Sequence, residues 1–243
     1  MIPTLNFPGG TTTGHLVNAV SDTGGSDIVL WETDTAGCCG TAPTLTRVGQ
    51  INTDPYTMPP DAQQKGSSAL IDTGDTELLG AVFRDQSGIW TAHTTGCNPG
   101  GDPTTRSCLR WYQLSVSGMS VLQSGTYGAT GKYYYYPAIH ADDSANATVV
   151  FNRSSSSEFV GIRYTGRLST DPLNNLQNSA NLRSGQGCYV LVDSKGRDRW
   201  GDYNGIAVDT SNGHMWLVSQ YAFGTSSTCG SNVWQTRAAE VHW

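Results

Sequence analysis

This chain of 243 residues has few charged side chains and no long apolar run. Asp, Glu, Lys and Arg make up 14% of it, and the formal net charge is -6. Nucleic-acid binding needs a basic stripe that neutralises phosphates, and none is visible. No stretch approaches the roughly 18 apolar residues of a membrane-spanning helix. The sequence therefore predicts neither nucleic acid nor a membrane span.

Several familiar catalytic and metal-binding motifs are also missing. There is no Gly-x-Ser-x-Gly elbow, no phosphate loop and no Cys-x-x-Cys pair. The five histidines are scattered without metal-ligand spacing, so no cofactor is expected. Oxygen-rich turns at 72–75 and 142–146 leave calcium open as a weaker alternative, since Asp and Asn are also common in ordinary hairpin turns.

Six cysteines lie in segments that look like loops. Cys97 and Cys108 flank a Gly/Pro-rich segment that a disulfide could close. Cys188 and Cys229 occupy two later loops, and adjacent Cys38 and Cys39 permit a vicinal bridge or two separate partners. This pattern favours disulfides over zinc and predicts a secreted or periplasmic protein. Residues 1–4 do not begin a signal peptide, so we expect that a signal peptide is absent from this sequence.

The residues that are abundant favour an all-β protein. Glycine occurs 29 times, Ser, Thr and Asn are plentiful, and no charge-rich helical pattern is present. Short apolar runs alternate with Gly, Asn and Asp turns, which is typical of hairpin-connected strands. A helical bundle is therefore excluded.

A motif with a period of about 70 residues organises the chain. Residues 199–209 join charged and aromatic side chains to a short apolar strand ending in Asp209. Related segments end at Asp142 and, more weakly, at Asp72, so the three aspartates are 70 and 67 positions apart. A repeat of this length built of short strands predicts an array of β-sheet blades.

The predicted fold class is a β-propeller-type array of about four antiparallel blades, possibly part of a larger ring. It forms a single domain over 1–243, with units at about 1–52, 53–118, 119–184 and 185–243. Residues 1–13 are expected to be irregular, and a β-sandwich is the alternative. The predicted strands are 15–20, 27–32, 44–51, 68–72, 77–84, 89–94, 109–116, 136–141, 148–153, 159–165, 205–208, 215–221 and 233–243.

Several of these segments resemble the blades of sialidase-like β-propellers. The resemblance rests on Tyr-Tyr-Pro-Ala-Ile at 135–139, Val-Val-Phe at 149–151 and Val-Gly-Ile-Arg-Tyr-Thr-Gly at 160–166. Residues 27–37 end like a degraded Asp-box (Ser/Thr-x-Asp-x-Gly-x-Thr-Trp). The likeness covers roughly 14–243 and extends to secreted bacterial sialidase-like proteins without a demonstrated activity.

The resemblance implies a fold but not a catalytic set. Sialidases bind a carboxylate with three arginines, one of which begins an inner strand in a Phe/Tyr-Arg-Ile-Pro motif. Tyr135 occupies that place here, and no intact Asp-box is present. The resemblance therefore implies a propeller without the sialidase chemistry.

A funnel at the blade ends is the predicted site, and it would bind a carbohydrate. Aromatic rings stack on sugars, while Asp and Arg bind hydroxyls or carboxylates. The alternative is that Arg199 and Asp202 form a structural ion pair and that the tyrosines fill the channel. Candidate catalytic residues are Asp202, Tyr203, Tyr135 and Arg199, and candidate ligand-binding residues are Arg84, Tyr134, Arg153, Trp200 and Tyr221.

Three functions follow from these candidates. Missing catalytic signatures favour a glycan-binding or structural propeller. A glycoside hydrolase would need a second carboxylate near Asp202. A polysaccharide lyase acting on an acidic glycan would need a tyrosine beside an arginine. A second chain or self-association could complete the ring.

Overall fold

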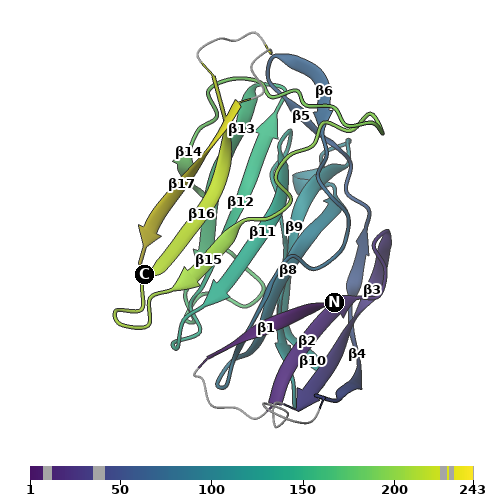
Figure 1. Ribbon diagram of the computed structural model, residues 1–243, viewed down its shortest axis with the longest axis vertical. Coiled ribbons are helices and arrows are strands. Elements are labelled where there is room, and N and C mark those ends of the chain that lie inside the picture. The colour runs from purple at the N-terminus through teal and green to yellow at the C-terminus, as the bar shows by residue number, and fades with distance from the viewer. Residues whose placement is uncertain (8–12, 35–41, 225–228, 230–232, 243) are drawn as a thin grey trace.

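The computed structural model describes all residues except 8–12, 35–41, 225–228, 230–232 and 243 (Figure 1). Its regular elements are strands and one short 3₁₀ turn, Pro99–Gly101, and the described ranges contain no α-helix. The all-β prediction is confirmed. Cys38, Cys39 and the end of the degraded Asp-box lie outside the described residues.

The largest sheet has eight strands and is nearly closed. Its edge strands β4 and β10 approach each other. Within it, β1 pairs with β7 in parallel and with β2 antiparallel. In sheet order the strands are β10 (Ser120–Tyr127), β9 (Arg106–Ser115), β8 (Gly88–Cys97), β7 (Ala81–Arg84), β1 (Ile2–Phe7), β2 (Thr13–Ala19), β3 (Gly24–Asp34) and β4 (Leu45–Thr57).

Three smaller sheets complete the molecule, and all their strand pairs are antiparallel. The first contains β11 (Tyr133–Ala141), β12 (Ala147–Ser155), β13 (Glu158–Arg167) and β14 (Ala180–Arg183). The second contains β15 (Gly205–Val208), β16 (Met215–Phe223) and β17 (Val233–Val241). The third is the hairpin of β5 (Ala62–Gln64) and β6 (Ser67–Ile71).

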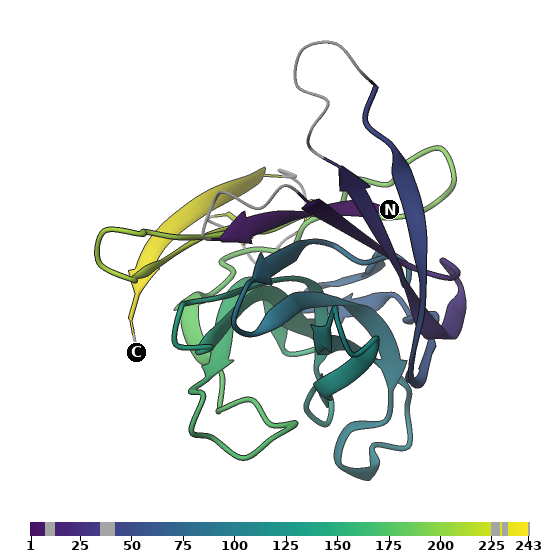
Figure 2. The same cartoon turned by 90° about the horizontal axis from the view of Figure 1, so that it is seen from below.

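The sheets pack face to face, and the alternation of side chains along the strands explains how. On β12, Val149 and Phe151 face the β7–β9 part of the large sheet, whereas Val150 faces the sheet of β16. Stacked Trp90 and Trp111, with ring centroids 6.1 Å apart, fill the first of these interfaces. Each large apolar side chain buried there contributes about 1.5–3 kcal/mol. Figure 2 shows the sheets as successive layers.

A separate cluster fills the inside of the curled eight-stranded sheet. Leu30 and Ile51 from one half meet Ile89 and Leu114 from the other, and all four are buried. Strands β8 and β9 are therefore covered on both faces, which explains why they read as continuous buried runs rather than alternating ones.

One predicted feature at the start of the chain was wrong and another is confirmed in part. Residues 1–13 were expected to be irregular, but Ile2–Phe7 forms β1, because β7 supplies it with a parallel partner that local sequence does not reveal. The strand expected at 68–72 is present as β6, but among the described residues it pairs with β5 and bridges to Asp198 through Ile71, so its place as an inner blade strand is not confirmed. Strand β10 was not predicted.

The later strands follow the prediction closely. β15 matches 205–208, and β11, β12, β13 and β16 overlap their predicted ranges within a few residues. Four of the cysteines predicted to form disulfides do so, Cys97 with Cys108 and Cys188 with Cys229.

Candidate functional site

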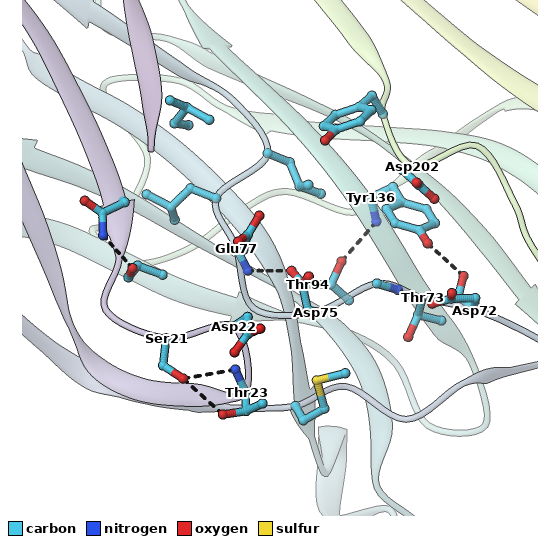
Figure 3. Close-up of a pocket in the computed structure, with 18 of the residues that line it drawn as sticks. Ser21, Asp22, Thr23, Asp72, Thr73, Asp75, Glu77, Thr94, Tyr136 and Asp202 are labelled. Atoms are coloured by element: carbon cyan, nitrogen blue, oxygen red, sulfur yellow. Dashed lines mark hydrogen bonds between the residues drawn. The ribbon is translucent and has the colours of Figure 1, made fainter. Parts of the chain in front are cut away.

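The main cavity lies between the turn after β2, the connection from β6 to β7 and the segment before β15 (Figure 3). Its volume is about 780 Å³, and Thr94 of β8 and Tyr136 of β11 form part of its wall. Three sequence-predicted residues line it: Arg199, Asp202 and Tyr203.

Asp72 is the centre of the polar network in this cavity. The residue is 6% exposed, and its Oδ1 accepts a hydrogen bond from the Gly74 N–H at 2.9 Å. Arg197 and Arg199 each place an Nη1 atom 3.4 Å from Asp72 Oδ2. Gly74 has φ +79°, and a Cβ there would lie 2.9 Å from a ring carbon of Tyr136, so this turn requires glycine.

Arg199 also binds Asp202, which confirms the ion pair predicted between them. One guanidinium thus bridges two carboxylates, from Asp72 and Asp202. The second oxygen of Asp202, Oδ1, is buried without a hydrogen-bond partner among the described residues. A buried acceptor without a donor costs free energy, so the two ion pairs of Arg199 are formed at some expense in stability.

Tyr136 closes the floor of the cavity. Its hydroxyl donates to the Asp72 carbonyl oxygen at 2.9 Å, and its N–H donates to Thr94 Oγ1 at 3.1 Å. Burial, followed by the charges of Asp72 and Asp202, raises the pKa of the Tyr136 phenol well above its usual range, so the phenol stays protonated. Figure 3 shows Tyr136 between these two carboxylates.

Sequence reasoning selected Tyr134 and Tyr135 but missed Tyr136. The β11–β12 register shifts between Tyr135 and Ala138, and Tyr136 has φ +54° just before Pro137. A bulge of this kind changes which face a side chain occupies, and simple alternation does not reveal it. The neighbouring proline is the one signal that could have indicated the irregularity.

The lining of the cavity is strongly acidic. Partial desolvation and the nearby Asp72 carboxylate raise the pKa of Asp61, while Arg197 opposes this shift. Neither Asp61 nor Arg197 was singled out from the sequence, because each lies in an irregular segment whose partners are distant along the chain. The lining includes six carboxylate residues (Asp22, Asp61, Asp72, Asp75, Glu77, Asp202) and two guanidinium residues (Arg197, Arg199).

Three predicted aromatic residues lie in the core instead. Tyr135 is fully buried and donates to Ser154 Oγ at 3.0 Å, so this position does not support the catalytic role suggested for it. Trp200 is 3% exposed and contacts the Tyr189 ring edge to face at 5.0 Å. Tyr221 is buried and donates to Gln235 Oε1 at 2.6 Å.

The other predicted ligand-binding residues also lie away from this cavity. Tyr134 packs in the interface between sheets. The Arg84 guanidinium is buried, donating from Nε to the Ala141 carbonyl at 2.7 Å and pairing with Asp143 at 2.8 Å. Arg153 lines a second, smaller cavity. Tyr203, by contrast, is 73% exposed at the edge of the main cavity.

The turns suggested for calcium make ordinary turn hydrogen bonds. Asp142 Oδ1 accepts from the N–H groups of Ser144 and Asn146, each at 2.9 Å, and Asp75 Oδ1 accepts from the Glu77 N–H at 2.8 Å. Within the described ranges, no group of three or more His, Cys, Asp or Glu side chains is arranged to hold a metal ion. The described residues likewise include no helix of the length and apolarity needed to cross a bilayer.

Comparison with known proteins identified no matching family model and no significantly similar curated protein or solved structure.

Proposed function

We propose that this protein binds carbohydrate in the main cavity and that its preferred ligands are neutral or amine-bearing sugars. The observation that carries this proposal is the bridged group of Asp72, Arg199 and Asp202 in the wall of the cavity. Carboxylates accept hydrogen bonds from sugar hydroxyls or amines, and guanidiniums donate to ring and hydroxyl oxygens. Such a set orients a polyhydroxylated ligand.

The charge of the cavity argues against an acidic glycan at this site. Six carboxylates against two guanidiniums leave an excess of negative charge, even with the pKa of Asp61 raised. A uronate or sialate carboxylate would be repelled. This favours a neutral or cationic ligand over the acidic glycans that a sialidase-like or lyase activity would need.

Tyr203 supports the same proposal. Its ring is 73% exposed next to the acidic group. An exposed tyrosine offers an apolar face for the C–H side of a sugar ring, while its hydroxyl stays in water. A polar cluster with an aromatic platform at its edge is a common arrangement for carbohydrate binding.

We also propose that the sheets are blades of a propeller-type array and that the protein is secreted. The β7–β10 part of the eight-stranded sheet and the sheets β11–β14 and β15–β17 are each antiparallel meanders, and they pack face to face in chain order. This arrangement supports the sialidase-like resemblance of the segments. Two disulfides are typical of proteins in oxidising compartments and support secretion.

Glycoside hydrolysis is the second candidate. It is favoured by the raised pKa of Asp61, which suits a general acid, together with two carboxylates held on one guanidinium. In that mechanism Asp61 donates a proton to the leaving oxygen, and Asp202 or Asp72 acts as base or nucleophile.

The test is calorimetric titration with neutral, amino and uronic oligosaccharides, followed by mass spectrometry of the products. We expect binding of neutral or amino sugars and loss of binding in Asp202→Asn. Asp143→Asn is a matched control, because Asp143 is 89% exposed and pairs with Arg84 rather than lining the cavity. Preference for uronic ligands, or equal loss in the two variants, would overturn the binding proposal. Shortened products would establish the hydrolase.

A further inference from the structure

A second cavity, of about 310 Å³, has the opposite charge. It is lined by the β12–β13 hairpin, the residue that follows β5 and the end of β14. Its charged residues are Lys65, Arg153, Arg163 and a single carboxylate residue, Glu158. A group of three cations is conspicuous in a chain whose net charge is -6.

The single carboxylate is already neutralised. Arg153 binds Glu158 with two parallel hydrogen bonds, from Nε to Oε2 and from Nη2 to Oε1, both 2.9 Å long. Lys132 Nζ lies 3.0 Å from Oε1 of the same carboxylate. Glu158 thus has two cationic partners and leaves no negative charge for the remaining two.

Lys65 and Arg163 are the cations without a carboxylate partner. Lys65 Nζ lies 5.0 Å from the centroid of the Phe159 ring, a cation–π contact that positions the amine. Arg163 is half-buried, and no Asp or Glu of the described residues lies within ion-pair distance of it. Burial, followed by the charge of Arg153, lowers the pKa of Arg163, while the Glu158 carboxylate opposes this shift.

A neutral donor completes the wall. Asn181 Oδ1 accepts from Ser184 Oγ at 3.3 Å, and the two side chains line the same cavity. With its oxygen used in this way, the Asn181 amide nitrogen is left to donate. Charged and neutral N–H groups around a small cavity are the donors that oxyanions prefer.

We propose that this cavity is an oxyanion-binding site in which Lys65 and Arg163, with Asn181, bind a carboxylate, sulfate or phosphate group. The site is separate from the acidic cavity and does not depend on the carbohydrate proposal. The anion is either a free inorganic ion or a group carried by a polyanionic chain, and the same cations would bind both.

The experiment measures binding of inorganic sulfate and phosphate by calorimetry and by the shift in melting temperature. Sodium chloride holds the ionic strength constant, because screening alone would otherwise change the result. A second arm compares dextran sulfate with uncharged dextran. Binding of inorganic ions alone would assign a free anion, and binding of dextran sulfate alone would assign a group on a polymer.

The variants are Arg163→Gln and Lys65→Gln, with Arg47→Gln as the control. Arg47 is exposed on β4 and, among the described residues, donates to Gln50, so its replacement removes the same charge outside the cavity. We expect the affinity to fall about tenfold or more in the cavity variants, as for loss of a charged hydrogen bond, and to stay unchanged in the control. Asp202→Asn should leave anion binding intact, whatever its effect on sugars.

Two results would overturn the proposal. The first is an absence of sulfate, phosphate and dextran sulfate binding beyond the effect of chloride. The second is an equal loss of affinity in Arg47→Gln, which would show that only the overall charge matters.

Discussion

Tyr136 is the residue that joins the packed core to the acidic cavity. Its ring is 2% exposed, its hydroxyl bonds the Asp72 carbonyl, and its backbone is held at φ +54° by the bulge in β11. A non-glycine residue in this region costs free energy, which surrounding contacts must offset. The position of Asp72, and hence of the two arginines on it, depends on this tyrosine.

Replacing Tyr136 with phenylalanine should therefore destabilise the protein. The variant leaves the Asp72 carbonyl without its donor in a buried site, and we expect a loss of about 1–3 kcal/mol in the free energy of unfolding. Urea titration measures the loss. Tyr203→Phe is the control, since its hydroxyl is in water and its removal should change stability by less than about 0.5 kcal/mol. Equal stability of Tyr136→Phe and the wild type would contradict this role.

At the residue scale, the sequence predicts which segments form the cavity better than it predicts which side chains line it. The segments 134–142 and 199–209 do contribute to the cavity, and the Arg199–Asp202 pair was foreseen. Tyr136 was not predicted, because the bulge in β11 determines which face of the strand its side chain occupies. Asp61 and Arg197 were not predicted either. Both interact with Asp72, which lies 11 positions from Asp61 and 125 positions from Arg197 along the chain.

At the scale of elements, two disulfides cross-link the chain, and the first joins the neighbouring strands β8 and β9. Cys97–Cys108 spans 11 positions between β8 and β9, and Cys188–Cys229 spans 41 positions before β17. A cross-link lowers the entropy of the unfolded chain more when the closed loop is longer. The second bridge should therefore contribute more to stability than the first.

Paired cysteine-to-alanine variants test this order. We expect a loss of about 3 kcal/mol without the Cys97–Cys108 bridge and about 4 kcal/mol without the Cys188–Cys229 bridge. Denaturant unfolding of the two double variants under non-reducing conditions gives the comparison. Because Cys108 is fully buried, a small cavity adds to its cost. A Cys188–Cys229 variant as stable as the wild type would contradict the prediction.

The strands that were predicted well share a local signal. β11, β12 and β16 carry dense runs of apolar residues between clear turns, so their pattern alone defines them. β1 and β10 lack such runs. They form because other strands offer edges to pair with, as β7 does for β1 and β9 does for β10. Pairing between distant segments is not visible in local sequence.

At the scale of the whole molecule, the last sheet has an exposed apolar face. Trp216 and Val218 are 45% and 44% exposed on the same face of β16, and Trp234 of β17 is 50% exposed. Cross-strand pairing with Ala222 places Trp234 on that face too. Contiguous exposed apolar side chains commonly mark contact surfaces between proteins, and a second copy of the chain is the occupant we expect here.

Self-association should therefore depend on these tryptophans. We expect the sedimentation coefficient to rise with protein concentration, and Trp216→Ser with Trp234→Ser to abolish the rise. Leu173→Ser serves as the control, because Leu173 is 63% exposed in a loop away from this sheet. A wild-type protein that stays monomeric at high concentration would rule out association through this face.

Acid should destabilise the whole molecule through its buried histidines, and burial also lowers the pKa of His15. Burial lowers the pKa of His93 to about 3 and that of His140 to about 4. In the unfolded chain both take up a proton near pH 6.5. Between these values the unfolded chain binds more protons than the folded one, so the free energy of unfolding falls as the pH drops below about 6.5.

Each histidine lowers the free energy of unfolding by at most about 1.4 kcal/mol per pH unit. This decrease continues until the pH approaches the pKa of the histidine in the folded protein. His93→Gln should reduce the slope between pH 6.5 and 5, although the loss of its contact with the Tyr112 hydroxyl, 3.0 Å away, lowers stability at every pH. The slope rather than the absolute stability is therefore the quantity to compare, by urea unfolding across this range. His214→Gln is the control, at a half-buried position where the histidine pairs with Glu240. This variant leaves His93 and His140 in place, so the stability that these two histidines cost in acid should be the same as in the wild type. If His93→Gln retained the full slope, protonation of this buried imidazole would not be what limits stability in acid.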